Sequence, residues 1–101
     1  MLKSSRLHEV GLVDWLRESP ENQKEYLKAS FEENVDMPDA IIAAIREIAV
    51  ARGYESMAKE AGLSKKSLYK ILAENRKTKP RFETIVQLIS SLGVRLTVET
   101  N

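Results

Sequence analysis

The stretch from Tyr54 to Ala73, YESMAKEAGLSKKSLYKILA, constrains the fold of this chain more than any other. Small and apolar residues recur there at helical spacing on both sides of Gly62, which predicts two short helices joined by a tight turn. The residues expected to face inward are Met57, Ala58 and Ala61, then Leu68, Ile71 and Leu72. Gly62 lies where the chain leaves the first helix, so we expect it to have a positive φ. Ser64 is expected to cap the second helix through its hydroxyl group.

This order of small, turning and capping residues resembles the helix-turn-helix of DNA-binding proteins. In that motif the second helix enters the major groove, and cations, hydroxyls and helix amides around it contact phosphates. The residues predicted to face DNA are Ser56, Lys59, Ser64, Lys65, Lys66, Ser67, Tyr69, Lys70, Arg76, Lys77 and Lys79. The alternative is an ordinary pair of helices that packs a core and binds nothing.

Charge is distributed unevenly along the chain, although the net charge is only +1. Residues 1–50 carry six Lys or Arg against ten Asp or Glu, whereas residues 51–101 carry ten against five. Such a separation is expected when one part of a protein meets an anion and another part does not. Because the basic half contains the helix pair, the charge pattern favours DNA as the anion.

The composition argues against several other classes of protein. The chain has no cysteine, which excludes a disulfide scaffold and a thiolate zinc site, and its single histidine, His8, has no cluster of carboxylates nearby. A phosphate-binding glycine loop is also missing, so we expect no enzyme activity, metal or cofactor. No apolar run is long enough for a signal peptide or a membrane span, which predicts a cytoplasmic protein.

The N-terminal third is predicted to be helical after a flexible arm, Met1–Val10. A short helical segment, LVDWLRE, comes first, and Ser19-Pro20 then supplies an N-cap and a first helical residue for a helix that runs towards Glu33. The residues expected to face inward from that helix are Tyr26, Leu27 and Phe31. Trp15 is expected to anchor the first segment to the rest of the protein, and a partner-binding role is the less favoured alternative.

One further helix is predicted before the pair and one after it. The first starts near Met37-Pro38, is capped by Asp36 and continues to Ala51 or Arg52. Its inward-facing residues are expected to be Ile41, Ile42, Ile45, Ile48 and Ala49. After a polar, basic loop, a last helix ends at Gly93. Its inner face is expected to consist of Phe82, Ile85, Val86, Ile89 and Leu92.

The C-terminal segment VRLTVET changes the period of its apolar residues. Val94, Leu96 and Val98 alternate with polar residues, which predicts a half-buried β-strand. No other segment looks like a partner for this strand, so we expect it to pair with a second copy of the chain and form a homodimer. Two helix pairs about 34 Å apart would then read a palindromic operator in double-stranded DNA.

The chain as a whole resembles a known family. The run from Met37 to Val98, with AKEAGLSKKSLYK and LGVRLTV as its most telling parts, is similar to the probable addiction-module antidote proteins, as is the earlier DWLRESPENQKEYLKASFEE. These are lambda-repressor-like antitoxins of the Xre type, encoded beside a RelE/ParE-like toxin. This chain departs from many relatives at Glu74–Lys79, where they carry a shorter loop rich in Gly and Asn.

The resemblance implies a mainly α fold: a lambda-repressor-like helix-turn-helix bundle with an N-terminal helical extension and a short C-terminal β-strand. It implies that residues 1–35 bind the toxin and that residues 36–101 bind operator DNA as a dimer and repress the shared promoter. The apolar anchors for the toxin would be Trp15, Leu16, Tyr26 and Phe31, unless these residues only pack the protein's own core. The alternatives are a free-standing, phage-type repressor without a toxin, and a module that binds only proteins.

Overall fold

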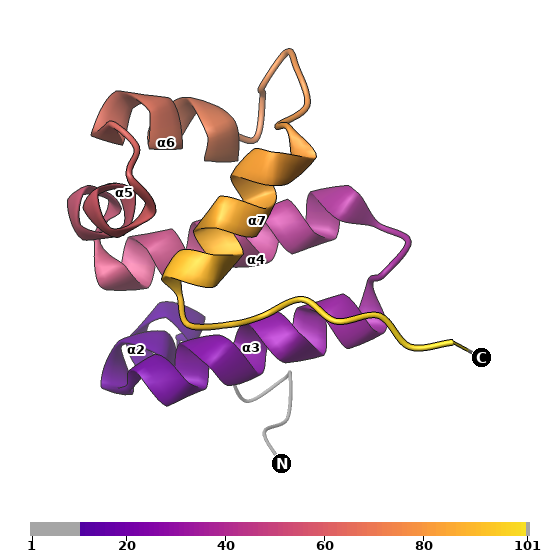
Figure 1. Ribbon diagram of the computed structural model, residues 1–101. Helices are drawn as coiled ribbons and strands as arrows, with labels where there is room; N and C mark the ends of the chain where they lie inside the picture. Colours follow the sequence, from indigo (N-terminus) through magenta and orange to yellow (C-terminus); the bar gives the residue numbers. More distant parts are fainter. Residues whose placement is uncertain (1–10, 101) are drawn as a thin grey trace.

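The computed structural model describes residues 11–100, which fold into six helices without a β-strand (Figure 1). The helices are α2 (Leu12–Glu18), α3 (Pro20–Glu33), α4 (Pro38–Arg52), α5 (Tyr54–Ala61), α6 (Lys65–Leu72) and α7 (Phe82–Ser91). The prediction of a mainly α fold is therefore confirmed. Among these residues no helix is both long and apolar enough to cross a membrane. The predicted flexible arm, Met1–Val10, lies outside the described residues.

Most helix ends follow the local chemistry that the sequence predicts. Ser19 caps α3 by accepting a hydrogen bond from the backbone N–H of Asn22 at 3.1 Å, and Ser64 caps α6 in the same way. Gly62 ends α5 with a φ of 73°, in the left-handed region. The predicted cap Asp36 is wrong, because α4 begins after Met37 without a side-chain cap. Pro38 at the start of α4 has no N–H, which leaves one donor fewer for a cap to satisfy.

The central helix of the fold is α4, which packs against α2 and α3 on one side and α5 and α6 on another (Figure 1). All five of its predicted inward-facing residues are buried. The large side chains that are fully buried around them include Leu16, Leu27, Met57, Leu68, Leu72 and Leu88. Because each large aliphatic side chain contributes roughly 1.5–3 kcal/mol when buried, this aliphatic cluster is the main source of stability.

One predicted core residue of α7 is wrong. Phe82 is 75% exposed, and Leu88, which was not predicted, is fully buried. Phe82 has the expected helical spacing from Ile89, but it is the first residue of α7 and lies beside an open hollow rather than a packed neighbour. The helical period fixes the direction of a side chain, whereas burial also requires another element opposite it.

The predicted C-terminal β-strand is also wrong for this chain. Residues 94–100 form no strand and instead run along α3 (Figure 1). Val94 packs against the core, whereas Val98 is 93% exposed. A strand needs a neighbour for its N–H and C=O groups, and no segment among residues 11–100 offers one.

We expect Leu88→Ala to lower the free energy of unfolding by about 2–5 kcal/mol, because it removes a fully buried side chain and leaves a cavity. The matched control is Val50→Ala, at an apolar residue that is 41% exposed. The control should cost less than about 1 kcal/mol. Urea denaturation followed by circular dichroism measures both values, and equal losses would contradict the assignment of Leu88 to the core.

Candidate functional site

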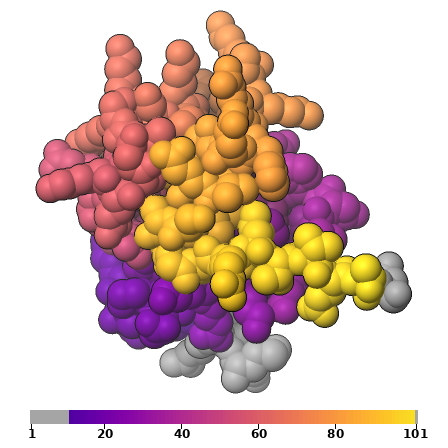
Figure 2. Space-filling model, viewed as in Figure 1, coloured from indigo at the N-terminus to yellow at the C-terminus, as the bar shows by residue number. Residues whose placement is uncertain are grey.

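Helix α6 separates its residues into a buried side and an exposed side. Leu68 and Leu72 are fully buried against the rest of the fold. The exposed residues of α6 are Lys65, Lys66, Ser67, Tyr69 and Lys70. Long side chains from this helix and from the loop after it project from the upper surface of the molecule (Figure 2). The three lysines form no ion pair with any residue in the described part of the chain, so their charges are available to an outside anion.

The turn between α5 and α6 is fixed by backbone and side-chain hydrogen bonds. The N–H of Leu63 donates to the carbonyl of Ala58 at 2.8 Å, and that of Gly62 donates to Lys59 at 3.2 Å. The side-chain amide of Gln87 on α7 donates to the carbonyl of Ala61. The angle between α5 and α6 is therefore set by the turn and supported by a third helix.

Two arginines of α4 hold the helix pair against the central helix. The Nε of Arg46 donates to the carbonyl of Leu72 at 2.5 Å, at the C-terminal end of α6. Arg52 forms an ion pair with Glu60 of α5 at 2.9 Å. Neither arginine was predicted as a functional residue, because both lie in a helix whose pattern indicates a core element and their partners are distant in sequence.

Two tyrosines stack at the edge of the exposed surface of α6. The rings of Tyr54 and Tyr69 are parallel, with an interplanar angle of 1° and centroids 4.0 Å apart. Burial raises the pKa of the Tyr54 hydroxyl, and the nearby Arg46 lowers it to a smaller extent. Tyr69 was predicted as a DNA-facing residue and Tyr54 was not. Residues on two different helices have no common period that would reveal this contact.

The remaining predicted DNA-facing residues fall into two groups. Ser56, Lys59, Lys77 and Lys79 are exposed. The hydroxyl of Ser64 donates to that of Ser67 at 2.8 Å and accepts from the Ser67 N–H at 3.0 Å, so Ser64 serves first as a helix cap. Ser67 remains exposed on the first turn of α6.

Arg76, which was predicted to contact the DNA backbone, forms hydrogen bonds within the protein and does not project from the surface. Its Nη2 donates to Asp39 at 2.6 Å and its Nη1 donates to the carbonyl of Ala73 at 3.2 Å. Only 12% of the side chain is exposed. The carboxylate at the start of α4 draws the guanidinium inward, so Arg76 ties the loop after α6 to the central helix.

The four residues predicted to bind a toxin lie on α2 and α3 and belong at least in part to the protein's own core. Leu16 is fully buried, so it offers no contact area to a partner while this fold is intact. Trp15, Tyr26 and Phe31 pack against the core but stay partly exposed. Hydrogen bonds from Asn22 and Gln23 to the carbonyls of Trp15 and Leu16, at 2.8 and 3.0 Å, join the two helices.

The three residues predicted to form a dimer differ in exposure. Val94 is half-buried, Leu96 is 37% exposed and Val98 projects from the surface. No group of residues able to hold a metal ion occurs in the part of the chain that the structure describes.

Comparison with known proteins identifies the family. A family model described as "Probable addiction module antidote protein" matches residues 6–100. An uncharacterized protein of Haemophilus influenzae is 26% identical over 96 residues, which cover 95% of this chain and 94% of the relative. No solved structure matches. Since the family model spans almost the whole sequence, the chain belongs to the probable addiction module antidote proteins.

Proposed function

We propose that this antidote protein binds double-stranded operator DNA through α5 and α6, which act as a helix-turn-helix. The observation that carries the proposal is the exposed side of α6, where Lys65, Lys66 and Lys70 form no ion pair with the described residues. The opposite side of the same helix is fixed by Leu68 and Leu72. A rigid helix that presents only cations and hydroxyls suits the major groove, which admits one α-helix.

In the proposed complex α6 lies in the major groove with its first turns against the base edges. Lysine donates to the O6 and N7 atoms of guanine, and the Ser67 hydroxyl donates or accepts. The stack on Tyr54 would hold the Tyr69 ring in one orientation beside these residues. Because the orientation is fixed before binding, Tyr69 would lose little conformational entropy on contact with DNA.

Phosphates on either side would be contacted by residues outside α6. Exposed cations, Lys59, Lys77 and Lys79, flank the helix in sequence, and the Ser56 hydroxyl lies in the first turn of α5. Glu55 also lies in that first turn and is exposed, so it would have to turn away from a phosphate. Arg76 is engaged with Asp39 and would support the loop rather than contact DNA.

An antidote implies a toxin partner, and we propose a RelE/ParE-like toxin that binds the N-terminal part, residues 1–35. Residues 36–101 would then bind DNA as a dimer and repress the promoter shared with the toxin. The membership of the antidote family favours this function over a free-standing, phage-type repressor. The same membership implies a role without enzyme activity.

Removal of Lys65 and Lys66 should weaken binding to the DNA upstream of the protein's own gene by about 10- to 100-fold. The slope of log K against log salt should be about −5 for the unchanged protein and shallower by about 2 for Lys65→Ala/Lys66→Ala. Fluorescence anisotropy over a range of salt concentrations measures both. Arg17→Ala/Lys24→Ala, which removes two cations from α2 and α3, is the matched control. Binding that is insensitive to salt would exclude the proposed mechanism.

The Tyr54→Phe variant should keep the stack and the DNA affinity, whereas Tyr54→Ala should lower the affinity by about threefold to tenfold, because the Tyr69 ring becomes mobile. The measurement is the same anisotropy titration, with Tyr69→Ala and the double variant included. If Tyr54 acts only through Tyr69, Tyr54→Ala should have no further effect in the absence of the Tyr69 ring. Independent losses would argue for a purely structural role of Tyr54.

The toxin-binding assignment predicts that Trp15→Ala/Tyr26→Ala lowers the affinity for the toxin at least about tenfold, because partly exposed aromatic residues contribute strongly to interfaces. The partner to use is the protein encoded beside this gene, and isothermal titration calorimetry gives the affinity. Circular dichroism must show an intact fold, since both residues also pack against the core. Unchanged affinity would remove α2 and α3 from the toxin interface.

A further inference from the structure

The loop between α6 and α7, residues 73–81, is strongly basic. It contains four basic residues and one acidic residue, which are Arg76, Lys77, Lys79, Arg81 and Glu74. Like charges that lie this close repel each other, so the charges of the loop do not by themselves favour one compact shape. A contact that fixes the loop must therefore come from another element of the fold.

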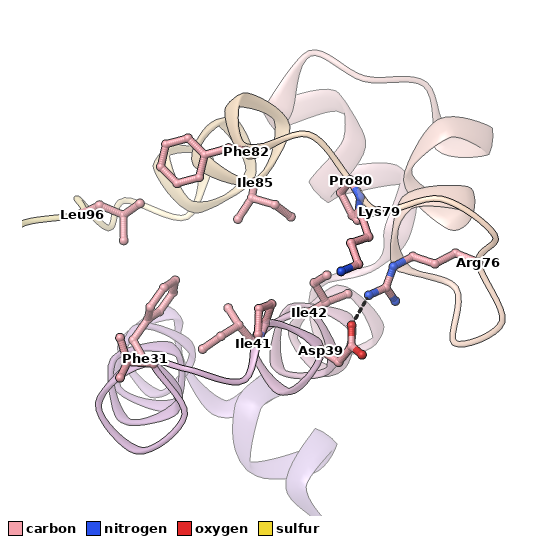
Figure 3. Close-up of a pocket in the computed structure, with 12 residues that line it drawn as sticks. Phe31, Asp39, Ile41, Ile42, Arg76, Lys79, Pro80, Phe82, Ile85 and Leu96 are labelled. Atoms are coloured by element: carbon pink, nitrogen blue, oxygen red, sulfur yellow. Dashed lines mark hydrogen bonds and ion pairs between the residues drawn. The ribbon is translucent and has the colours of Figure 1, made fainter.

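The start of α4 supplies a contact to the middle of this loop. An open groove lies there, with Ile41 of α4 on one side and Phe82 of α7 on the other, and Asp39 and Arg76 meet at one end of it (Figure 3). The carboxylate of Asp39 accepts a hydrogen bond from Nη2 of Arg76 at 2.6 Å. The Nη1 of Arg76 donates to the carbonyl of Ala73 at 3.2 Å, so the same guanidinium also holds the backbone at the start of the loop.

Apolar packing does not hold this part of the loop. A hollow of about 340 Å³ lies between the loop and α4, and every residue that lines it has a polar or charged side chain. Arg46 contacts the carbonyl of Leu72 and the carboxylate of Glu74, which fixes the beginning of the loop. For residues 75–79, the bond between Asp39 and Arg76 is the hydrogen bond or ion pair that joins them to another element among the described residues.

We propose that Asp39 is a positioning residue for DNA binding, which holds the loop so that Lys77 and Lys79 are presented to phosphates. This inference rests on the DNA binding proposed above and adds to it a carboxylate from outside the helix pair. Lys77 follows Arg76 directly, and neither lysine forms an ion pair with a described residue. Because the loop is held before DNA arrives, less conformational entropy is lost when the lysines bind.

The proposal gives Asp39 an effect opposite to that of an ordinary carboxylate. Removal of a negative charge near a DNA-binding surface strengthens binding, because a carboxylate repels phosphates. The same result is expected if Arg76 leaves Asp39 and contacts a phosphate itself, since Asp39 then competes with DNA. Only 12% of the Arg76 side chain is exposed, however, and its departure would break both of its hydrogen bonds. If Asp39 positions the loop, its removal weakens binding.

The first test measures the loop in the absence of DNA. Trypsin cleaves after Arg76 and Lys77, and the rate follows the population of molecules in which the loop is open. Asp39→Ala should raise this rate at least about threefold, as measured by mass spectrometry. The matched control is Asp36→Ala, which removes an exposed carboxylate that has no ion pair within residues 11–100 and should leave the rate unchanged. Equal rates in the two variants would overturn the proposal.

The second test measures the affinity for the upstream DNA by fluorescence anisotropy at one salt concentration. Asp39→Ala and Asp39→Asn should each lower the affinity about threefold to tenfold, whereas Asp36→Ala removes the same charge and should not lower it. Arg76→Ala should cause the same loss as Asp39→Ala, and the double variant should lose no more. Circular dichroism should show intact folds, because Asp39 is 89% exposed and such an ion pair contributes little to stability. Asp39 variants that bind as tightly as the unchanged protein, or more tightly, would refute the positioning role.

The third test asks whether Asp39 acts through the two lysines. The same titration is made with Lys77→Ala/Lys79→Ala, with and without Asp39→Ala. If Asp39 only presents these lysines, its removal should have no further effect once they are absent. A further loss as large as that in the unchanged protein would assign Asp39 a different role.

The outcome separates this inference from the proposed function. If the unchanged protein binds the upstream DNA in a salt-dependent way and Asp39→Ala binds equally well, only the role of Asp39 is wrong. If the unchanged protein does not bind that DNA, the proposed function is wrong, and the role of Asp39 in DNA binding is lost with it, whatever the trypsin test shows about the loop.

Discussion

The burial of one aliphatic helix determines how the rest of this protein is arranged. Ile45, Ile48 and Ala49 of α4 are completely excluded from water, and four other helices pack around α4 to achieve this. Arg46 and Arg52 lie on the same helix and reach the helix pair, so apolar packing and hydrogen bonding position α5 and α6 together. The orientation of the lysines on α6 therefore depends on the packing and hydrogen bonds that hold α5 and α6 against α4.

The two ends of α4 are covered differently, and this difference gives the molecule two distinct surfaces. Towards its C-terminal end the helix lies beneath α5 and beside α2, which leaves a charged, rigid surface on α6. Towards its N-terminal end Ile41 and Ile42 lie under the open groove, where Phe82 and Val35 remain exposed. Apolar packing is nearly complete at one end and unfinished at the other, which is where a partner gains the most by binding.

The antidote family implies a toxin partner, and the proposed DNA binding would require a second, separate surface. The acidic residues are concentrated in the N-terminal half and the basic residues in the C-terminal half. The fold keeps the free lysines of α6 apart from Glu32, Glu33 and Asp36 at the end of α3 and the turn after it. Charges of opposite sign that do not neutralise each other within the chain remain available for separate partners.

The sequence by itself determined the features that depend on neighbouring residues. The helical periods, the caps at Ser19 and Ser64 and the left-handed Gly62 were all predictable, because each depends on chemistry within a few positions. Among the candidate site residues, the exposure of Lys65, Lys66 and Lys70 followed from the position of Leu68 and Leu72 on the other side of the same helix.

Contacts between distant segments were decided only by the tertiary structure. Arg76 turned inward because Asp39, which precedes it by 37 positions, lies within reach of its guanidinium. Phe82 stayed exposed because the helices opposite it leave an open hollow rather than a packed contact. The stack of Tyr54 on Tyr69 joins two helices across a turn. The C-terminal segment alternates like a strand, but a strand exists only where another segment completes its hydrogen bonds. A local sequence pattern predicts the secondary structure and the exposure of a residue. Only the tertiary structure determines which distant residue it contacts.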